Sequence, residues 1–174
     1  SDANSGAATS SAIEVIMKTR DQYIGEIRYA IRLCQRTARL YRRIQTAGTF
    51  LSIVGGSAAL TGIVDKIPGA LPGWVPMAGG ALLALAGAAL IAIRAADKAA
   101  QNETDVKRYQ ALMAKSHSMD EKQLAAAIEE AHQGDAPEVE TLRNVAYNDV
   151  VHEFNRSDQA IPLTRTERFL KAVA

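Results

Sequence analysis

Residues 46–64 read TAGTFLSIVGGSAALTGIV, which is 19 residues without a charged side chain. A second uncharged stretch covers residues 67–93, and its last 17 residues, from Met77 on, contain no proline. A helix needs about 20 apolar residues to cross a bilayer. Both stretches therefore predict membrane-spanning helices, although their many Gly, Ala, Ser and Thr residues keep the hydrophobicity moderate.

The segment between the two stretches is expected to break any helix. Residues 65–76 contain three prolines and two glycines, which end helices and form turns. Trp74 is predicted to lie at the membrane interface, because an amphipathic ring is favoured at the headgroup level. The sequence thus predicts a transmembrane hairpin over residues 44–93, with spans at about 46–64 and 75–93.

Charge is distributed unevenly along the 174 residues. Residues 1–49 carry eight basic and four acidic side chains, residues 50–93 carry one of each, and residues 94–174 carry eleven basic and fourteen acidic ones. The net charge of +1 excludes a strongly basic nucleic-acid binder as a description of the whole chain. Because basic residues flank the hairpin on the side of both chain ends, both termini are expected in the cytoplasm of a bacterium, with the hairpin in the inner membrane.

The remaining segments also predict helices, so the expected fold class is all-α: a two-helix transmembrane hairpin with long helical extensions that form a cytoplasmic bundle. Residues 1–11 are small and polar and are expected to be disordered or processed. Apolar residues recur at steps of four and three from Ile13 to Tyr41, which predicts an amphipathic basic helix over residues 12–43 that packs against another helix.

Residues 94–174 are predicted to form the cytoplasmic helical region. Its first helix is expected to continue the second span without a break, through Arg94. Ser118–Glu121 and Thr164–Glu167 have the pattern of capping boxes that open two later helices, and Gly134 is expected to end the first of these.

An arginine stripe follows the basic helix. Arg28, Arg32, Arg36, Arg39 and Arg43 follow steps of four, four, three and four, which places five guanidinium groups on one helix face, and Arg42 lies beside them. Three interpretations stay open. The stripe binds anionic lipid headgroups beside the first span, or a phosphate-bearing ligand, or it pairs with the acidic C-terminal region.

Small residues recur four positions apart in both spans, which lets helix backbones approach closely in lipid. The alternative is that they only supply apolar length. The residues predicted to pack the spans are Ser52, Gly56, Gly62, Gly80, Ala84 and Gly87.

Catalytic motifs are missing from the sequence. It contains no phosphate-binding loop, dinucleotide fingerprint, nucleophile elbow or zinc-protease helix motif. Glu129 and His132 have the spacing of one arm of a di-iron site, but no second arm is present. Cys34 lies on the apolar seam of the basic helix and is expected to be a small core residue. The sequence therefore predicts neither enzymatic activity nor a cofactor or metal site.

The layout resembles a known family. An Arg-rich helix end (residues 39–43) leads into a two-span hairpin with a Gly, Pro and Trp turn, and the second span runs into Asp97-Lys98, the segment VKRYQAL at residues 106–112, an acidic helix and Ala136-Pro137-Glu138. This order is similar to that of the SLATT family, bacterial two-transmembrane proteins associated with nucleotide-synthesising and nucleotide-sensing conflict systems. The resemblance covers roughly residues 20–155.

Membership of this family would imply a membrane effector of antiphage defence that assembles and perturbs the inner membrane when a nucleotide-sensing partner protein signals. The expected partners are thus a bilayer with anionic lipids, further copies of the chain and that sensing partner, without direct nucleic-acid binding. Two alternatives stay open. One is a soluble, colicin-like pore-forming bundle that buries the hairpin, and the other is a membrane adaptor without activity of its own.

Overall fold

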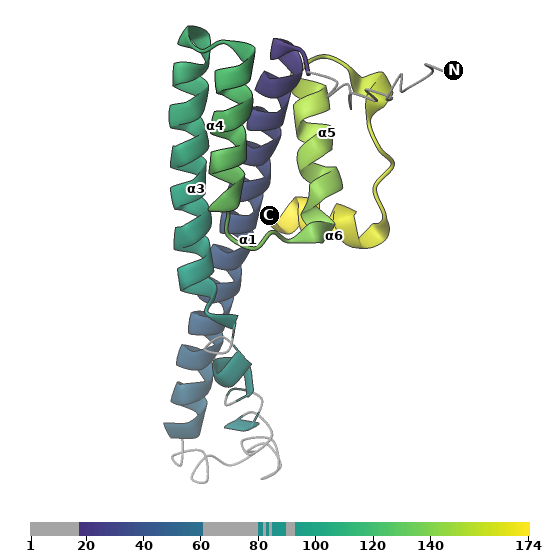
Figure 1. Cartoon of the computed structure of the whole chain (residues 1–174). Helices are drawn as coiled ribbons and strands as arrows, with labels where there is room; N and C mark the ends of the chain where they lie inside the picture. The colour runs from purple at the N-terminus through teal and green to yellow at the C-terminus, as the bar shows by residue number, and fades with distance from the viewer. Residues whose placement is uncertain (1–17, 61–79, 82, 84, 90–92) are drawn as a thin grey trace, which may run out of the picture.

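The computed structural model describes residues 18–60, 80–81, 83, 85–89 and 93–174, and for residues 54–60 it describes the backbone only. The α-helices with complete bounds are α1 (Arg20–Leu60), α3 (Ala95–Lys115), α4 (Glu121–Gln133), α5 (Arg143–Glu153) and α6 (Arg165–Val173). Three short 3-10 helices join them: η2 (Ser116–Ser118), η3 (Glu140–Leu142) and η4 (Ser157–Gln159). The described residues contain no β-strand, so the all-α prediction is confirmed (Figure 1). The predicted start segment, residues 1–11, lies outside them.

Helix α1 is the axis of the molecule. It is 41 residues long, which corresponds to roughly 60 Å at 1.5 Å per residue. Its first half lies between α3 and α4 on one side and α5 and α6 on the other, and its second half projects beyond them (Figure 1). We call residues 18–43 and 94–174 the head, and the described part of residues 44–93 the stem. The predicted boundary between the basic helix and the hairpin falls inside this one continuous helix.

The first core of the head joins α1 to α3 and α4. From α1 it contains Tyr23, Ile27, Ala30 and Cys34, at helical steps of four, three and four. The helices α3 and α4 contribute Tyr109, Leu112, Leu124, Ile128 and Ala131. The described part of the apolar seam expected on the basic helix is therefore present, because Ile27 and Cys34 belong to it and both are buried. The start of the seam at Ile13 lies outside the described residues.

A second core lies on another face of α1 and was not predicted. Leu33 and Leu40 pack there with Leu142 of η3, Ala146 of α5 and the C-terminal Ala174. Apolar residues on two faces of α1 explain why a single seam did not describe this helix. The consequence is that α1 holds together two layers of the head, α3 with α4 and α5 with α6.

Two helices begin with capping boxes, one of them at a different residue from the prediction. In α6 the Thr164 hydroxyl and the Glu167 side chain exchange bonds with each other's backbone N–H, as predicted. In α4 the capping pair is Asp120 and Gln123, whereas the sequence suggested Ser118 and Glu121. The Ser118 hydroxyl instead donates to the Lys115 carbonyl at 2.9 Å, because η2 extends the preceding helix by one turn.

The expectation of an unbroken helix through Arg94 is wrong. Arg94 has φ 50° and ψ 47°, in the left-handed region, and stands at the N-cap of α3. Non-glycine residues rarely adopt this conformation. Its guanidinium bonds Asp97 in the first turn of α3 at 2.7 Å. The chain therefore turns at the border between stem and head, where the sequence contains neither Gly nor Pro.

Glu167 should make the docking of α6 sensitive to acid. The backbone N–H of Thr164 donates to its carboxylate at 2.7 Å, the Thr164 hydroxyl accepts from the Glu167 N–H, and Asn144 of α5 also donates to the carboxylate at 2.7 Å. These bonds lower the pKa of Glu167 below its ordinary 4.5. A lowered pKa contributes stability above the ordinary pKa, and that stability is lost as pH falls through the folded-state pKa.

We expect Glu167→Gln to destabilise the head at pH 7. The difference from the unmodified chain should be smaller at pH 3 than at pH 7, because the stability contributed by a lowered pKa is lost as pH falls below 4.5 and through that lowered pKa. Parallel denaturant unfolding at the two pH values measures this. A difference that is equally large at pH 3 would contradict the role given to the carboxylate charge.

Candidate functional site

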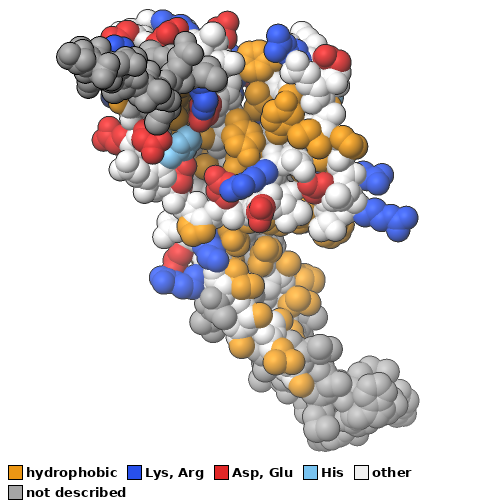
Figure 2. All heavy atoms as spheres, turned by 45° about the vertical axis from the view of Figure 1, so that its right-hand side comes forward, with side chains coloured by type: hydrophobic (Ala, Val, Ile, Leu, Met, Phe, Trp, Pro, Cys, Tyr) orange, Lys and Arg blue, Asp and Glu red, His pale blue; other side chains and the backbone are white. Residues whose placement is uncertain are grey.

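The described part of the stem carries an exposed apolar surface. Phe50 and Ile53 of α1 are 65% and 66% exposed, and Leu85 of the returning segment is 68% exposed. From Thr46 to Ile53, every residue except Gly48 is exposed. Figure 2 shows hydrophobic side chains along the projecting stem, whereas basic and acidic side chains gather on the head. No part of the head covers these apolar side chains.

Two hydroxyl groups of the described stem are satisfied within their own helix. The Thr46 hydroxyl donates to the Arg42 carbonyl at 2.9 Å, and the Ser52 hydroxyl donates to the Gly48 carbonyl at 2.8 Å. A polar group that is paired in this way costs little in an apolar solvent, whereas an unpaired one costs several kcal/mol. The described stem therefore combines apolar side chains with two hydroxyl groups, those of Thr46 and Ser52, that need no water.

Among the described helices, none is long and apolar enough to cross a membrane. The predicted spans 46–64 and 75–93 lie partly outside the described residues. Three residues proposed for the hairpin lie wholly outside them: Gly62, Trp74 and Ala84.

Two of the proposed packing glycines show no close contact with the described residues. A Cβ atom placed at Gly80 or Gly87 would meet nothing described within 4 Å. Gly56 lies in α1, and Ser52 is exposed. The role of the small residues in packing stays a prediction.

The upper part of the arginine stripe is paired with α5. Arg28 and Arg32 each contact Glu153 at 3.0 Å. Arg36 makes a two-pronged bond to Asp149, from Nε at 2.7 Å and from Nη2 at 3.0 Å, and its Nη1 donates to the Lys171 carbonyl at 3.1 Å. For these three arginines, the structure supports the interpretation that the stripe pairs with the acidic C-terminal region.

The lower part of the stripe lies close to the stem. Arg42 pairs with Glu103 of α3 at 2.5 Å, and Arg43 donates to the Ala172 carbonyl at 3.0 Å. Arg39 is exposed and lines a groove of about 560 Å³ between α1 and α3 together with Lys107. Lys98 of α3 lies over the ring of Tyr41 at 5.4 Å. We call the basic residues nearest the stem the basic collar; they are Arg39, Arg42, Arg43, Arg94 and Lys98.

Replacing Arg36 and Arg32 one at a time should show that a largely buried ion pair contributes more to the unfolding free energy than an exposed one. The side chains of Arg36 and Asp149 are 13% and 21% exposed, so Arg36→Gln should cost about 2 kcal/mol of unfolding free energy by leaving a carboxylate without its charged donors. Arg32→Gln should cost less than about 0.5 kcal/mol, because its pair is exposed and Arg28 still contacts Glu153. Denaturant unfolding of both variants measures this, and equal losses would contradict it.

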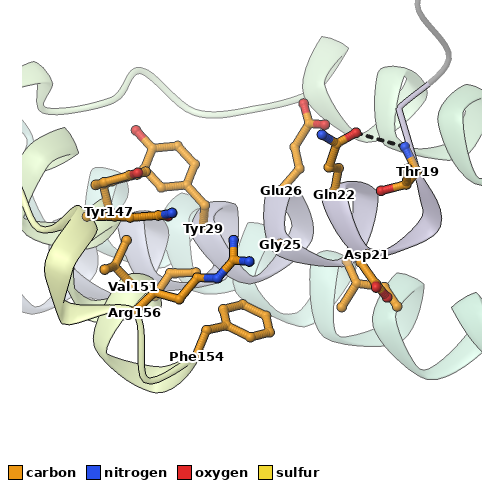
Figure 3. A pocket seen from close by; sticks show the side chains of 13 residues that line it. Thr19, Asp21, Gln22, Gly25, Glu26, Tyr29, Tyr147, Val151, Phe154 and Arg156 are labelled. Carbon is orange, nitrogen blue, oxygen red and sulfur yellow. Dashed lines mark hydrogen bonds between the residues drawn. The ribbon is translucent and has the colours of Figure 1, made fainter.

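A second groove, of about 1030 Å³, lies between the start of α1 and the end of α5 (Figure 3). Tyr29, Tyr147 and Phe154 line it. Its carboxylates, Asp21 and Glu26, are five positions apart on α1 and therefore diverge. Lys18 pairs with Glu26 at 2.8 Å. The two carboxylates of this groove therefore do not lie side by side as an acid–base pair.

Reactive chemistry is also not supported elsewhere in the described residues. Burial raises the pKa of the Cys34 thiol to about 12, so the nucleophilic thiolate is scarce at neutral pH. Glu129 and His132 are both exposed. No three His, Cys, Asp or Glu side chains of the described part gather as metal ligands.

A buried polar cluster on α3 was not recognised from the sequence. Asp105 accepts from Arg108 at 2.8 Å and from the Ala136 N–H at 2.9 Å. Arg108 also donates to Asp135 at 2.7 Å, and the Tyr109 hydroxyl donates to the same carboxylate at 2.6 Å. The cluster fixes the chain after α4 to α3, so its role is structural. The sequence marked this region by the helix-ending Gly134 and by the segments at residues 106–112 and 136–138, none of which indicated a polar cluster.

No family model matches the chain, and no curated protein or solved structure matches it either. The resemblance to the SLATT family therefore stays a prediction from the sequence.

Proposed function

We propose that this chain is a bacterial membrane effector whose stem inserts into the inner membrane and whose helical head stays in the cytoplasm. The observation that carries the proposal is the exposed, uncharged stem, which projects from a charged head with a basic collar at the junction. Moving one Phe, Leu or Ile side chain out of water gains about 1.5–3 kcal/mol. A bilayer offers this gain to Phe50, Leu51, Ile53 and Leu85 together.

The basic collar suits the lipid headgroups on the cytoplasmic side. Arg42 and Arg43 lie within about 6 Å of Thr46 along α1, and Arg94 directly follows the uncharged stretch. Each basic residue near an anionic lipid surface contributes about 1 kcal/mol. The collar therefore favours an orientation with both chain ends in the cytoplasm.

The alternative of a soluble bundle that buries its hairpin has less support. Such a bundle needs helices that wrap the apolar segment, whereas the two cores of the head contain only Ile44 from the described stem. Phe50, Leu51 and Ile53 are left exposed. We therefore favour the integral membrane form.

The activity proposed for the membrane form is assembly of several copies that permeabilise the inner membrane. The open sides of Gly80 and Gly87 support close contact between stems. The resemblance to the SLATT family adds the proposed context, which is antiphage defence triggered by a nucleotide-sensing partner protein.

Two measurements test this proposal in order. Alkaline carbonate extraction of membranes from expressing cells should leave the chain in the pellet; release into the supernatant would overturn the integral form. Vesicles that contain the purified chain and a trapped dye should then leak in proportion to the number of chains per vesicle. Intact vesicles with inserted protein would instead favour the membrane adaptor.

A further inference from the structure

Helix α6 lies at the end of the head that faces the stem. It runs across the direction of α1 at the lower edge of the head (Figure 1). Arg43, three residues before the uncharged stretch, donates to the carbonyl of Ala172 at 3.0 Å. Leu170 and Val173 pack in the second core with Leu40 and Ile44 of α1. These contacts place the last turn of α6 at the level of the basic collar.

One face of α6 points away from the head. Its buried face holds Glu167, which accepts a bond from Asn144 at the start of α5, and Leu170. At 100° per residue, the opposite face carries Arg165, Phe169 and Ala172. All three are exposed, and the ring of Phe169 is 65% exposed. This opposite face therefore turns away from α5 and from the second core, at the end of the head where α6 lies (Figure 1).

The composition of this face matches a lipid surface. Arg168, Arg165 and Phe169 follow one another around the exposed part of the helix, with both arginines on the same side of the ring, and the one acidic side chain of α6, Glu167, is buried. Basic side chains next to an exposed aromatic ring suit the headgroup layer of a membrane. Arg36 and Arg43 bond the carbonyls of Lys171 and Ala172 and so hold the helix in this position.

We propose that α6 is an interfacial helix, which rests Phe169 on the surface of the same bilayer that holds the stem while Arg165 and Arg168 contact anionic headgroups. This inference rests on the proposed membrane insertion. It assigns the C-terminal helix a second contact with the membrane, which fixes the tilt of the head.

The test uses the tryptophan fluorescence of the full chain in lipid nanodiscs. Trp74 is the one tryptophan of the sequence, so Trp74→Phe provides a dark background for Phe169→Trp. The control is Lys122→Trp in the same background, at an exposed position on the first turn of α4. Lys122 lies at the opposite end of the head, near Ser116, which contacts Arg20 at the start of α1.

In nanodiscs with phosphatidylglycerol and lipids brominated near the carbonyl, the emission of Phe169→Trp should fall at least twofold, while Lys122→Trp should keep its emission. Adding Arg165→Gln and Arg168→Gln should remove most of this quenching. Equal emission of both tryptophan variants with and without bromine, in discs that contain the chain, would overturn the inference and leave the proposed function standing.

Two other outcomes would also overturn it. If the chain does not elute with the discs, membrane insertion fails and the inference fails with it. If Phe169→Trp shows a blue-shifted emission that depends on the number of chains per disc and not on bromine, the face binds a second copy of the chain.

Discussion

Placing one aspartate on each helix of the stem, Ile53→Asp together with Leu85→Asp, is expected to release the chain from membranes. Ile53 lies about 10 Å from Thr46 along α1, and Leu85 stands eight positions before Ile93 in the second predicted span, so both are expected near the middle of a hydrocarbon core about 30 Å thick. An aspartate there costs about 2.5–3.5 kcal/mol. Two of them should lower the membrane-bound fraction by more than about a thousandfold.

Carbonate extraction of cells that express the double variant measures this release. The matched control is Gln110→Asp with Gln133→Asp, two exposed positions on the head, which should stay in the pellet. The head of the stem variant should remain folded, because neither Ile53 nor Leu85 belongs to a core. Full retention of the stem variant in the membrane would contradict the placement of the stem in lipid.

The largest loss of stability is expected from Tyr109→Ala. The Tyr109 side chain is fully buried in the first core, and its hydroxyl bonds Asp135 at 2.6 Å. Replacing a buried aromatic side chain by alanine costs about 3–5 kcal/mol. The cavity would open where α1, α3 and α4 meet. For a chain of this length, 3 kcal/mol corresponds to a fall of roughly 6–12 °C in melting temperature.

Tyr109→Phe distinguishes the contribution of the ring to stability from that of the hydroxyl. This variant keeps the packing and loses one hydrogen bond, while Arg108 still donates to Asp135, so it should cost about 1 kcal/mol. Thermal unfolding followed by circular dichroism in mild detergent compares both variants. If the phenylalanine variant lost as much stability as the alanine variant, the polar cluster and not the core would hold α4 in place.

Local features of the fold could be predicted because their causes are local. The capping box of Thr164 and Glu167 depends on residues three positions apart, and the helix end at Gly134 depends on one residue. The periodicity of Ile27 and Cys34 identified one buried face of α1. The turn at Arg94 could not be predicted in this way, because no helix-breaking residue marks it.

Partners of the charged residues could not be predicted from the sequence. The arginine stripe allowed lipid, a phosphate ligand or the acidic C-terminal region, and its upper part turned out to pair with α5, more than 100 residues away along the chain. Asp105 and Asp135 were given no role from the sequence, yet both lie in one cluster with Arg108. Long-range contacts of this kind follow from how the helices pack.

The sequence by itself determined the helical fold class and the division into charged ends and an uncharged middle, because periodicity and charge depend only on the order of residues along the chain. Only the tertiary structure decided which arginines of the stripe pair with acidic residues of α5. The second core of α1 brings α5 and α6 onto the stripe, where Glu153 and Asp149 pair with the upper arginines. Arg39, Arg42 and Arg43 are closer to the stem along α1 than Arg36 is. The ion pairs of Asp149 and Glu153 in the described residues do not include them.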